Sequence, residues 1–490
     1  MIELLAQYLP ILLIGVGYGF MFGLIPVAGA TVALIALYPY AENFIGDPYS
    51  MVVMTTAVVI SASIGDMFSS VVLNIPGGGG SAATMIDGYP MAKKGQAARA
   101  LSAGLCSAAA QSLIWGLLFI VLLPYYVKIV YLFGTAEMLL FLLLAMTVIC
   151  FVSNRYWIRG LIAASIGMFV GLIGEVPDVV GEYRWTFGWD YLKSGIEILP
   201  VVAGVLAMPE IIEGVMGKNK IVIAAKNTWA QMWQGVKDCW KYRVDSLRGG
   251  VVGGIIGALP GLGGGIGDYI AYGLTAANKR KDDKVPFGQG NVRGVIGPEG
   301  ANLSHKATAY LPTVLFGIPG APFEVLVLAL LAYVGLDLGS PRLLNNQQFF
   351  TALSFGYMAS LFITVVISIF FIRYAIKLTQ IPKQIWFPFL LISIVWACTR
   401  HTGGIDDYII LVVMCVIGFV LRYLKMNRIA FLIGFVLAAK IEKIGGAYWQ
   451  LYHKEPLIFL TRPMSLFLLI TIICIIIYAL RFKGNKIEYY

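Results

Sequence analysis

The chain has 490 residues, of which 59% are hydrophobic and 13% are charged, and its mean hydropathy is +0.81. Since a soluble globular protein carries about 25% charged residues, this composition excludes an ordinary soluble domain and indicates a protein of the lipid bilayer. The net charge of +10 comes from Lys and Arg in short loops, which is typical of cytoplasmic loops and excludes a nucleic-acid partner.

Apolar runs long enough to cross a bilayer recur along the whole chain. We expect an all-α polytopic membrane protein with roughly 10 to 13 hydrophobic segments. Residues 1–40 lack a basic region and a small-residue cleavage site, so we expect no cleaved signal peptide. The clearest runs cover residues 101–123, 136–152, 161–172, 357–372, 408–421 and 464–480.

Cysteine and histidine are too few and too scattered to indicate catalysis or a metal centre. The six cysteines contain no C-x-x-C, and the three histidines form no H-E-x-x-H. We therefore expect no enzyme activity, no metal and no cofactor.

Charge places the polar loops on the two sides of the membrane. Residues 175–191 carry four acids and one Arg, which favours the outer face, whereas 278–293 are basic and favour the inside. Residues 218–248 have seven basic residues with Trp229, Trp233 and Trp240 among them, as in an amphipathic helix on the cytoplasmic surface. The positive-inside rule conflicts with the count of spans near residues 440–462, because that count places outside a loop that is flanked by Lys440, Lys443, Lys454 and Arg462.

Two pairs of similar segments indicate an internal repeat. "GLIPVAGATVALIALYPY" (23–40) resembles "GALPGLGGGIGDYIAYGL" (257–274), and "SVVLNIPGGGG" (70–80) resembles "TVLFGIPGAPF" (313–323). We expect a first repeat at 1–216, a basic connector at 217–248 and a second repeat at 249–490. Because Arg248 and Lys279–Lys281 both favour the inside, residues between them predict a re-entrant hairpin and two inverted repeats with broken helices.

The four Pro-Gly breaks are the candidate substrate site. Broken helices leave free backbone N–H groups that suit a carboxylate and free carbonyls that suit a cation. The alternative is that each break is a simple kink or a packing surface. The predicted substrate-binding residues are Asn74, Pro76, Gly77, Gly78, Ser81, Pro260, Gly261, Gly263, Asn302, His305, Lys306, Gly317, Pro319 and Gly320.

Ionisable residues beside the breaks complete the predicted site. Glu299, Asn302, Ser304, His305 and Lys306 precede the last break, and a loop at the cytoplasmic surface is the alternative interpretation. We expect Asp87, Lys93 and Lys94 in a loop. The residues predicted to bind a coupling ion, Na⁺ or H⁺, are Pro26, Ala28, Asp66, Asp268 and Glu324. The alternative interpretation of the three acidic residues is that each forms an ion pair with a nearby Lys or Arg.

"NIPGGGGSAATMIDGYPMAKKGQAARAL" (74–101) resembles the signature of the large permease subunit of the tripartite tricarboxylate transporters, the TctA family. "YRWTFGWDYLKSGIEILPVVAG", "GALPGLGGGIGDYIAYG", "GVIGPEGAN" and "FGIPG" resemble further family blocks in the same order, from about residue 15 to about residue 430. The resemblance implies a multi-pass permease of the cytoplasmic (inner) membrane for small tri- or dicarboxylates such as citrate. It also implies cation-coupled symport, a small four-helix membrane subunit and a periplasmic substrate-binding protein.

The chain departs from the family pattern at the presumed site. It has Gly78-Gly79-Gly80 where Thr-Pro-Ala is usual, Leu303-Ser304 where Asn-Ala is usual, and Ala321-Pro322-Phe323-Glu324 in place of a small polar turn. His305 and Lys306 are also atypical. The expected function is carboxylate transport, with an elevator-like motion; the alternative is a passive channel or a membrane scaffold that does not transport.

Overall fold

The computed structural model describes residues 2–152, 157–176, 181–216, 228–260, 264–278, 280, 283–374, 383–399, 404–453 and 458–481. These residues are almost entirely helical, with one two-stranded hairpin, in which Gly174 pairs with Arg184 and Glu175 with Tyr183. The predicted all-α class is confirmed.

The first part of the chain supplies the following elements: α1 (Ile2–Leu24), α2 (Gly29–Leu37), η1 (Tyr38–Phe44), α3 (Pro48–Leu73), η2 (Gly79–Ser81), α4 (Met85–Lys93), α5 (Ala97–Val130), α6 (Thr135–Val152), α7 (Trp157–Gly171), β1 (Gly174–Glu175), β2 (Tyr183–Arg184), η3 (Asp190–Ser194), α8 (Ile198–Val202), η4 (Ala203–Ala207) and α9 (Met208–Met216). The remaining helices are α10 (Thr228–Lys241), α11 (Arg243–Ala258), α12 (Gly264–Ala277), α13 (Arg293–Phe316), α14 (Pro322–Tyr333), α15 (Pro341–Leu344), α16 (Gln347–Phe371), α17 (Lys383–Cys398), α18 (Ile405–Tyr423), α19 (Arg428–Tyr452), α20 (Ile458–Thr461) and α21 (Pro463–Arg481).

Several helices have the length and composition of membrane spans. Among the described residues, Gln7–Leu24, Pro48–Leu73, Ala97–Val130 and Gln347–Phe371 are long and apolar enough to cross a bilayer. Shorter apolar helices cover Thr135–Cys150, Trp157–Gly171, Pro322–Tyr333, Phe387–Cys398 and Pro463–Ile477. A helical membrane protein is confirmed, and the total of 10 to 13 segments stays a prediction.

Helices α3 and α13 form the centre of the molecule. Asp47 caps the start of α3 by accepting a hydrogen bond from the Ser50 N–H, and Pro48 fits the first turn. Both helices end with a residue in the left-handed conformation, Asn74 after α3 (φ 57°) and Gly317 after α13 (φ 61°). Nearly every residue of the two helices is buried, including polar ones.

Glycines at a spacing of four let a neighbouring helix approach each central helix. Gly15, Gly19 and Gly23 of α1 face α3, where a Cβ on Gly23 would lie 2.3 Å from the Ala62 carbonyl oxygen. Gly249, Gly253 and Gly257 of α11 face α13 in the same way, and a Cβ on Gly253 would lie 2.1 Å from the Ala301 carbonyl oxygen. The two stripes have the same spacing of four residues, and the predicted inverted repeats stay a prediction.

The predicted breaks interrupt the helices at four places. We name them the first break (25–28, between α1 and α2), the second break (74–84, between α3 and α4), the third break (259–260, after α11) and the fourth break (317–321, between α13 and α14). Helices α1 and α2 both pack on α3, and α11 and α12 both pack on α13. Two helices joined by a break therefore flank each central helix.

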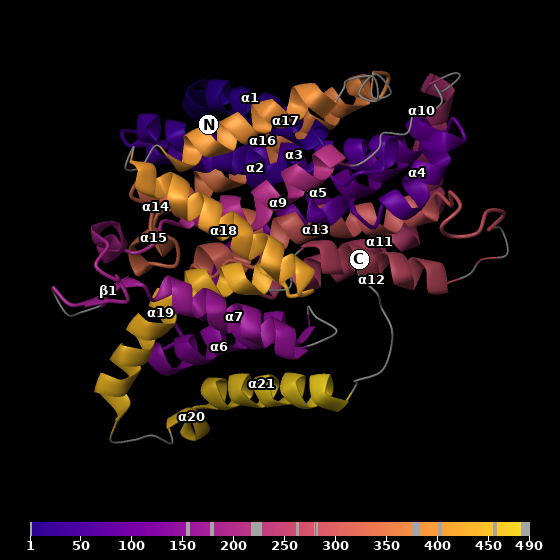
Figure 1. The fold of residues 1–490 in the computed structure, drawn as a ribbon. Helices are drawn as coiled ribbons and strands as arrows, with labels where there is room; N and C mark the ends of the chain where they lie inside the picture. Colours follow the sequence, from indigo (N-terminus) through magenta and orange to yellow (C-terminus); the bar gives the residue numbers. More distant parts are fainter. Residues whose placement is uncertain are drawn as a thin grey trace.

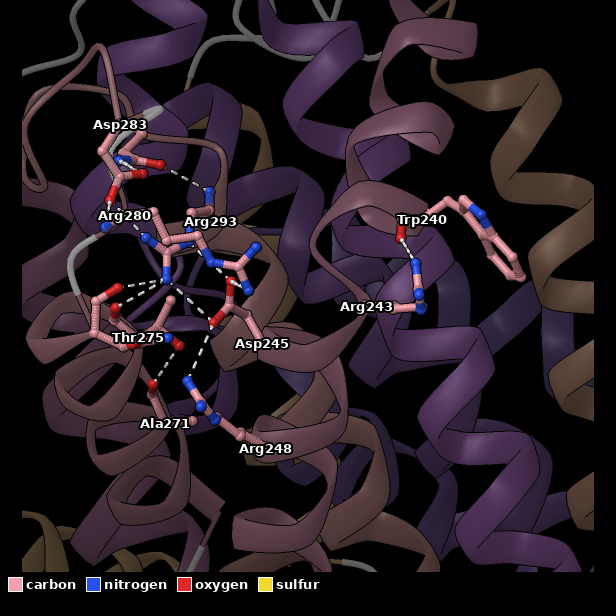
Figure 2. A network of polar contacts seen from close by, with 11 residues as sticks. Trp240, Arg243, Asp245, Arg248, Ala271, Thr275, Arg280, Asp283 and Arg293 are labelled. Carbon is pink, nitrogen blue, oxygen red and sulfur yellow. Dashed lines mark hydrogen bonds and ion pairs between the residues drawn. The ribbon is translucent and has the colours of Figure 1, made fainter.

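A buried ionic network fixes one end of α13. Arg293 is fully buried, and its Nε donates to Asp245 of α11 at 2.8 Å while its Nη1 donates to Asp283 at 2.6 Å. Arg293 also donates to the carbonyl oxygen of Asn278 beyond α12. Figure 2 shows Asp245 between Arg293 and Arg248. Together with the bond to Asn278, these contacts join the starts of α11 and α13 to the end of α12.

The alternative interpretation of residues 299–306 as a surface loop is wrong, because they lie within the buried helix α13. The expected loop positions of Asp87 and Lys93 are also wrong. Asp87 lies in α4 and is fully buried; it accepts hydrogen bonds from the N–H groups of Gly290 and Asn291, both at 2.8 Å. Lys93 ends the same helix.

The predicted amphipathic helix is α10, with Trp229, Trp233 and Trp240 exposed. Helix α11 begins at Arg243, within the range 217–248 of the predicted connector, and the predicted domain boundaries stay a prediction. In Figure 1, α10 lies at the right and the β1 hairpin of the acidic stretch at the left, at opposite ends of the helices.

Candidate functional site

The first and second breaks contact each other beside α3. The Val27 N–H donates to the Pro76 carbonyl oxygen at 3.1 Å. Val27 has φ 72°, a strained conformation for a β-branched residue, and strain of this kind is concentrated at functional sites. Predicted ion-site residues Pro26 and Ala28 lie in this first break and are buried. The two breaks therefore form one irregular region inside the helical core.

Asp66 of α3 lies against the second break. A Cβ on Gly77 would lie 2.5 Å from Asp66 Oδ1, and a Cβ on Gly78 would lie 2.5 Å from Asp66 Oδ2. Glycine is therefore needed for the backbone to come this close to the carboxyl group. Asp66 is 5% exposed, and its Oδ1 has no hydrogen-bond partner among the described residues.

The second half of the chain supplies the opposite wall. A Cβ on Gly80 would lie 2.2 Å from Asn302 Oδ1 of α13 and 3.4 Å from Asp268 Oδ2 of α12. In the described part of the chain, both oxygens of Asp268 and both side-chain polar atoms of Asn302 lack a hydrogen-bond partner. Buried polar atoms without partners are costly, so an arrangement of this kind indicates a ligand, an ion or water.

Glu299 and Lys306 lie on the same face of α13 as Asn302, at helical spacings of three and four residues. Glu299 Oε1 accepts a hydrogen bond from Thr84 Oγ1 at 2.6 Å, which ties α13 to the second break. The Lys306 ammonium lies 4.0 Å from the centre of the Phe323 ring and interacts electrostatically with Asp66, Asp268 and Glu324. We call Asp66, Asp268, Glu299, Asn302 and Lys306 the central polar cluster.

The fourth break is occupied by side chains of the chain itself. Glu324 Oε2 accepts hydrogen bonds from the N–H groups of Gly320 and Ala321 and from Thr313 Oγ1. Lys440 of α19 donates to the carbonyl oxygens of Phe316 and Gly317 at the end of α13. Pro319 is buried in this break.

Other predicted site residues have different positions. Asn74 is exposed and ends α3, while buried Ser81 accepts a hydrogen bond from Ser70 at 2.7 Å and braces the second break. His305 is buried, its Nδ1 has no hydrogen-bond partner in the described part of the chain, and its backbone packs against Gly257. Pro260 is buried in the third break, and Gly261 and Gly263 lie outside the described residues.

Sequence reasoning missed Lys440 and the bond between Glu299 and Thr84. Lys440 lies within α19 and reaches a break more than a hundred residues earlier, so no local pattern marks it. Thr84 and Glu299 are separated by 215 positions. Only the packing of α13 against the second break brings the latter pair together.

The cluster is able to hold anionic and cationic groups side by side. Lys306, Asn302 and the backbone of the second break offer donors, whereas Asp66, Asp268 and Glu299 offer acceptors. Among the described residues, no three His, Cys, Asp or Glu side chains converge as metal ligands. Its donors and acceptors are of the kinds that bind a polar solute reversibly.

Comparison with known proteins identifies relatives along nearly the whole chain. The profile described as "Tripartite tricarboxylate transporter TctA family" matches residues 9–433. The chain is 26% identical over 483 residues to an Agrobacterium vitis protein named "Uncharacterized 52.8 kDa protein in TAR-I ttuC' 3'region", covering 97% of this chain and 94% of the relative. A second protein of that organism, "Uncharacterized protein in TAR-II ttuC' 3'region", is 28% identical over 196 residues, covering 39% of this chain and 79% of the relative. No solved structure is significantly similar to the chain. The matched range includes all four breaks and the central polar cluster.

Proposed function

The chain belongs to the tripartite tricarboxylate transporter TctA family, and from this premise we propose that it is a secondary active permease for a small organic tri- or dicarboxylate. The proposed transport is cation-coupled symport across the cytoplasmic membrane, driven by Na⁺ or H⁺. No enzymatic step is part of the proposal.

The observation that carries the proposal is the central polar cluster. Asp66, Asp268 and Asn302 are buried at the second break, and each has at least one side-chain atom without a partner among the described residues. Leaving such groups unsatisfied costs about 1–3 kcal/mol each, and more for a charged group. Reversible binding of a solute and an ion at these side chains explains why they are buried without hydrogen-bond partners.

Charge balance supports coupling to a cation. The acids of the cluster, together with Glu324, outnumber the single ammonium of Lys306 among the described groups that interact there. An anionic substrate adds further negative charge to a buried site, where uncompensated charge is expensive. We propose that the coupling ion, bound beside Asp66 and the first break, supplies the missing positive charge.

The substrate carboxylates have donors on the other side of the cluster. Gly77 and Gly78 present backbone N–H groups, while Asn302 presents an amide and Lys306 an ammonium group. We assign these four residues to the substrate and Asp66 and Asp268 to the coupling ion.

The repeated architecture suits alternating access. Each half has a broken helix pair around a central helix, and we propose that the halves are inverted repeats that move by an elevator-like displacement. We propose a small membrane subunit and a periplasmic substrate-binding protein as partners; the family name "tripartite" supports partner subunits in general.

Binding to the purified chain tests the proposal. Calorimetric titration with succinate, malate and citrate, each with and without Na⁺ and at two pH values, is expected to show at least one carboxylate whose affinity depends on the cation. If none of the three binds under any of these conditions, the proposed function fails. Carboxylate binding whose affinity does not change with Na⁺ or with pH would instead favour a passive channel.

A further inference from the structure

The fourth break already contains a carboxylate. Glu324 Oε2 accepts a hydrogen bond from Thr313 Oγ1 at 3.0 Å and from the Ala321 N–H at 3.2 Å, and it also accepts from the Gly320 N–H. Successive backbone N–H groups and a hydroxyl around one carboxylate oxygen form the arrangement that binds an anion at a broken helix. The chain supplies this anion itself.

The carbonyl side of the same break is also filled. The Lys440 ammonium donates to Phe316 O at 2.5 Å and to Gly317 O at 3.3 Å. These carbonyls end α13 and carry the negative end of its dipole, which an ammonium group stabilises. The N–H groups of Gly320 and Ala321 and the carbonyl oxygens of Phe316 and Gly317 are therefore already engaged by side chains of the chain.

The second break differs in this respect. No described residue accepts a hydrogen bond from the N–H groups of Gly77 or Gly78. The nearby carboxyl of Asp66 has a free oxygen, and the amide of Asn302 beside Gly80 is unpaired among the described residues. The two breaks have similar sequences, but the N–H groups of Gly77 and Gly78 in the second have no acceptor among the described residues, whereas those of Gly320 and Ala321 in the fourth donate to Glu324. In this sense we call the second break open and the fourth closed.

Glu324 nevertheless belongs to the electrostatic surroundings of the cluster. Its carboxylate is 1% exposed, and Oε1 has no partner among the described residues. Lys306 interacts electrostatically with Glu324, and its ammonium lies over the ring of the preceding residue, Phe323. A substrate held by Lys306 is thus exposed to the charge of Glu324.

We propose that Glu324 is a specificity-determining residue that fills a third carboxylate position, so that the chain selects dicarboxylates over tricarboxylates. This inference rests on the proposed function. Two positions remain open, the N–H groups of Gly77 and Gly78 and the donors Lys306 and Asn302. A third substrate carboxylate meets the charge of Glu324 and donors that are already engaged, and like charges at a buried site repel strongly.

Titration of the full-length chain in lipid nanodiscs with malate and with citrate tests this role. The wild-type chain is expected to bind malate at least about tenfold more tightly than citrate. Glu324→Ser frees the N–H groups of Gly320 and Ala321, and it is expected to reduce this ratio about tenfold through tighter citrate binding.

Two further variants separate charge from structure. Glu324→Gln keeps an acceptor for the N–H groups but removes the charge, so citrate binding is expected to strengthen by about threefold, less than with Ser. Glu137→Ser is the matched control, because Glu137 similarly accepts the Gly134 N–H at the start of α6 and pairs with Arg462 instead of the cluster. It is expected to keep the wild-type ratio.

Equal wild-type affinities for malate and citrate would overturn the inference while leaving the proposed function intact. So would a Glu324→Ser variant that weakens both ligands equally, since that result describes a helix cap only. If Glu324→Ser fails to fold, an unchanged ratio in Glu324→Gln overturns the inference. Absence of any carboxylate binding to the wild type removes the proposed function and this inference together.

Discussion

At the scale of single residues, the second break brings the backbone of Gly77 and Gly78 close against the carboxyl group of Asp66. The sequence predicts Gly77 and Gly78 as site residues because Pro-Gly runs break helices wherever they occur. It does not predict that Asp66 lies against them, because that contact requires the chain to reverse direction after α3. Local signals therefore locate the break, and tertiary packing decides which acid faces it.

Gly77→Ala is expected to weaken carboxylate binding by at least about tenfold. The added Cβ would lie 2.5 Å from Asp66 Oδ1 and 2.9 Å from Ser69 Oγ, so the break must move away from α3. Gly17→Ala on α1 is the control, since a Cβ there meets nothing within 4 Å. Malate calorimetry measures both variants, and equal affinities for Gly77→Ala and the wild type would contradict the assignment.

Lys306→Gln is expected to weaken malate binding by at least about tenfold, because it removes the ammonium that interacts with Asp66, Asp268 and Glu324. The glutamine keeps a hydrogen-bond donor of similar length, so a loss of malate affinity is attributed to the missing charge. Titration with malate at two salt concentrations measures this loss. If Lys306 serves only to neutralise the acids, the variant loses thermal stability and keeps its malate affinity.

At the scale of elements, two helices with matching glycine stripes flank two buried central helices. The sequence predicts the repeat from its Pro-Gly motifs. In the structure, the glycine stripes at Gly15–Gly23 and Gly249–Gly257 are a second feature that the two halves share. The alternative of a surface loop at residues 299–306, which the structure contradicts, has a physical origin. Polar residues within a membrane protein resemble a loop until partners such as Thr84 and Gly80 are known.

Arg293→Ala is expected to destabilise the fold by about 3–5 kcal/mol, because it leaves the buried carboxyl of Asp245 without its closest partner. Arg248→Ala is the matched control. Its side chain is 46% exposed and lies 3.8 Å from the same carboxyl group, so a change of at most about 1 kcal/mol is expected. Thermal unfolding in detergent compares the two, and equal shifts of Tm would refute the role assigned to Arg293.

At the scale of the whole molecule, composition was sufficient to predict a helical membrane protein, since so few charges cannot cover a soluble surface. The arrangement of the basic and acidic stretches at opposite ends of the helices also agrees with the predicted sides (Figure 1). The closed state of the fourth break was not predictable, because Lys440 reaches it from α19.

The predicted orientation is testable by labelling. In a chain without native cysteines, Lys241→Cys on α10 is expected to react with an impermeant maleimide from the cytoplasmic side only. Glu182→Cys beside the β1–β2 hairpin is expected to react from the outside only, and both positions are exposed. Reaction of both from the same side would refute the topology.

The central claim is that the chain couples carboxylate movement to a cation gradient. Uptake of labelled malate into proteoliposomes containing the purified chain, with and without an imposed Na⁺ or H⁺ gradient, tests it most directly. We expect one gradient to drive malate above its equilibrium concentration and Asp66→Asn to abolish this accumulation. Uptake that only reaches equilibrium under both gradients, with the same rate in Asp66→Asn, would contradict the account.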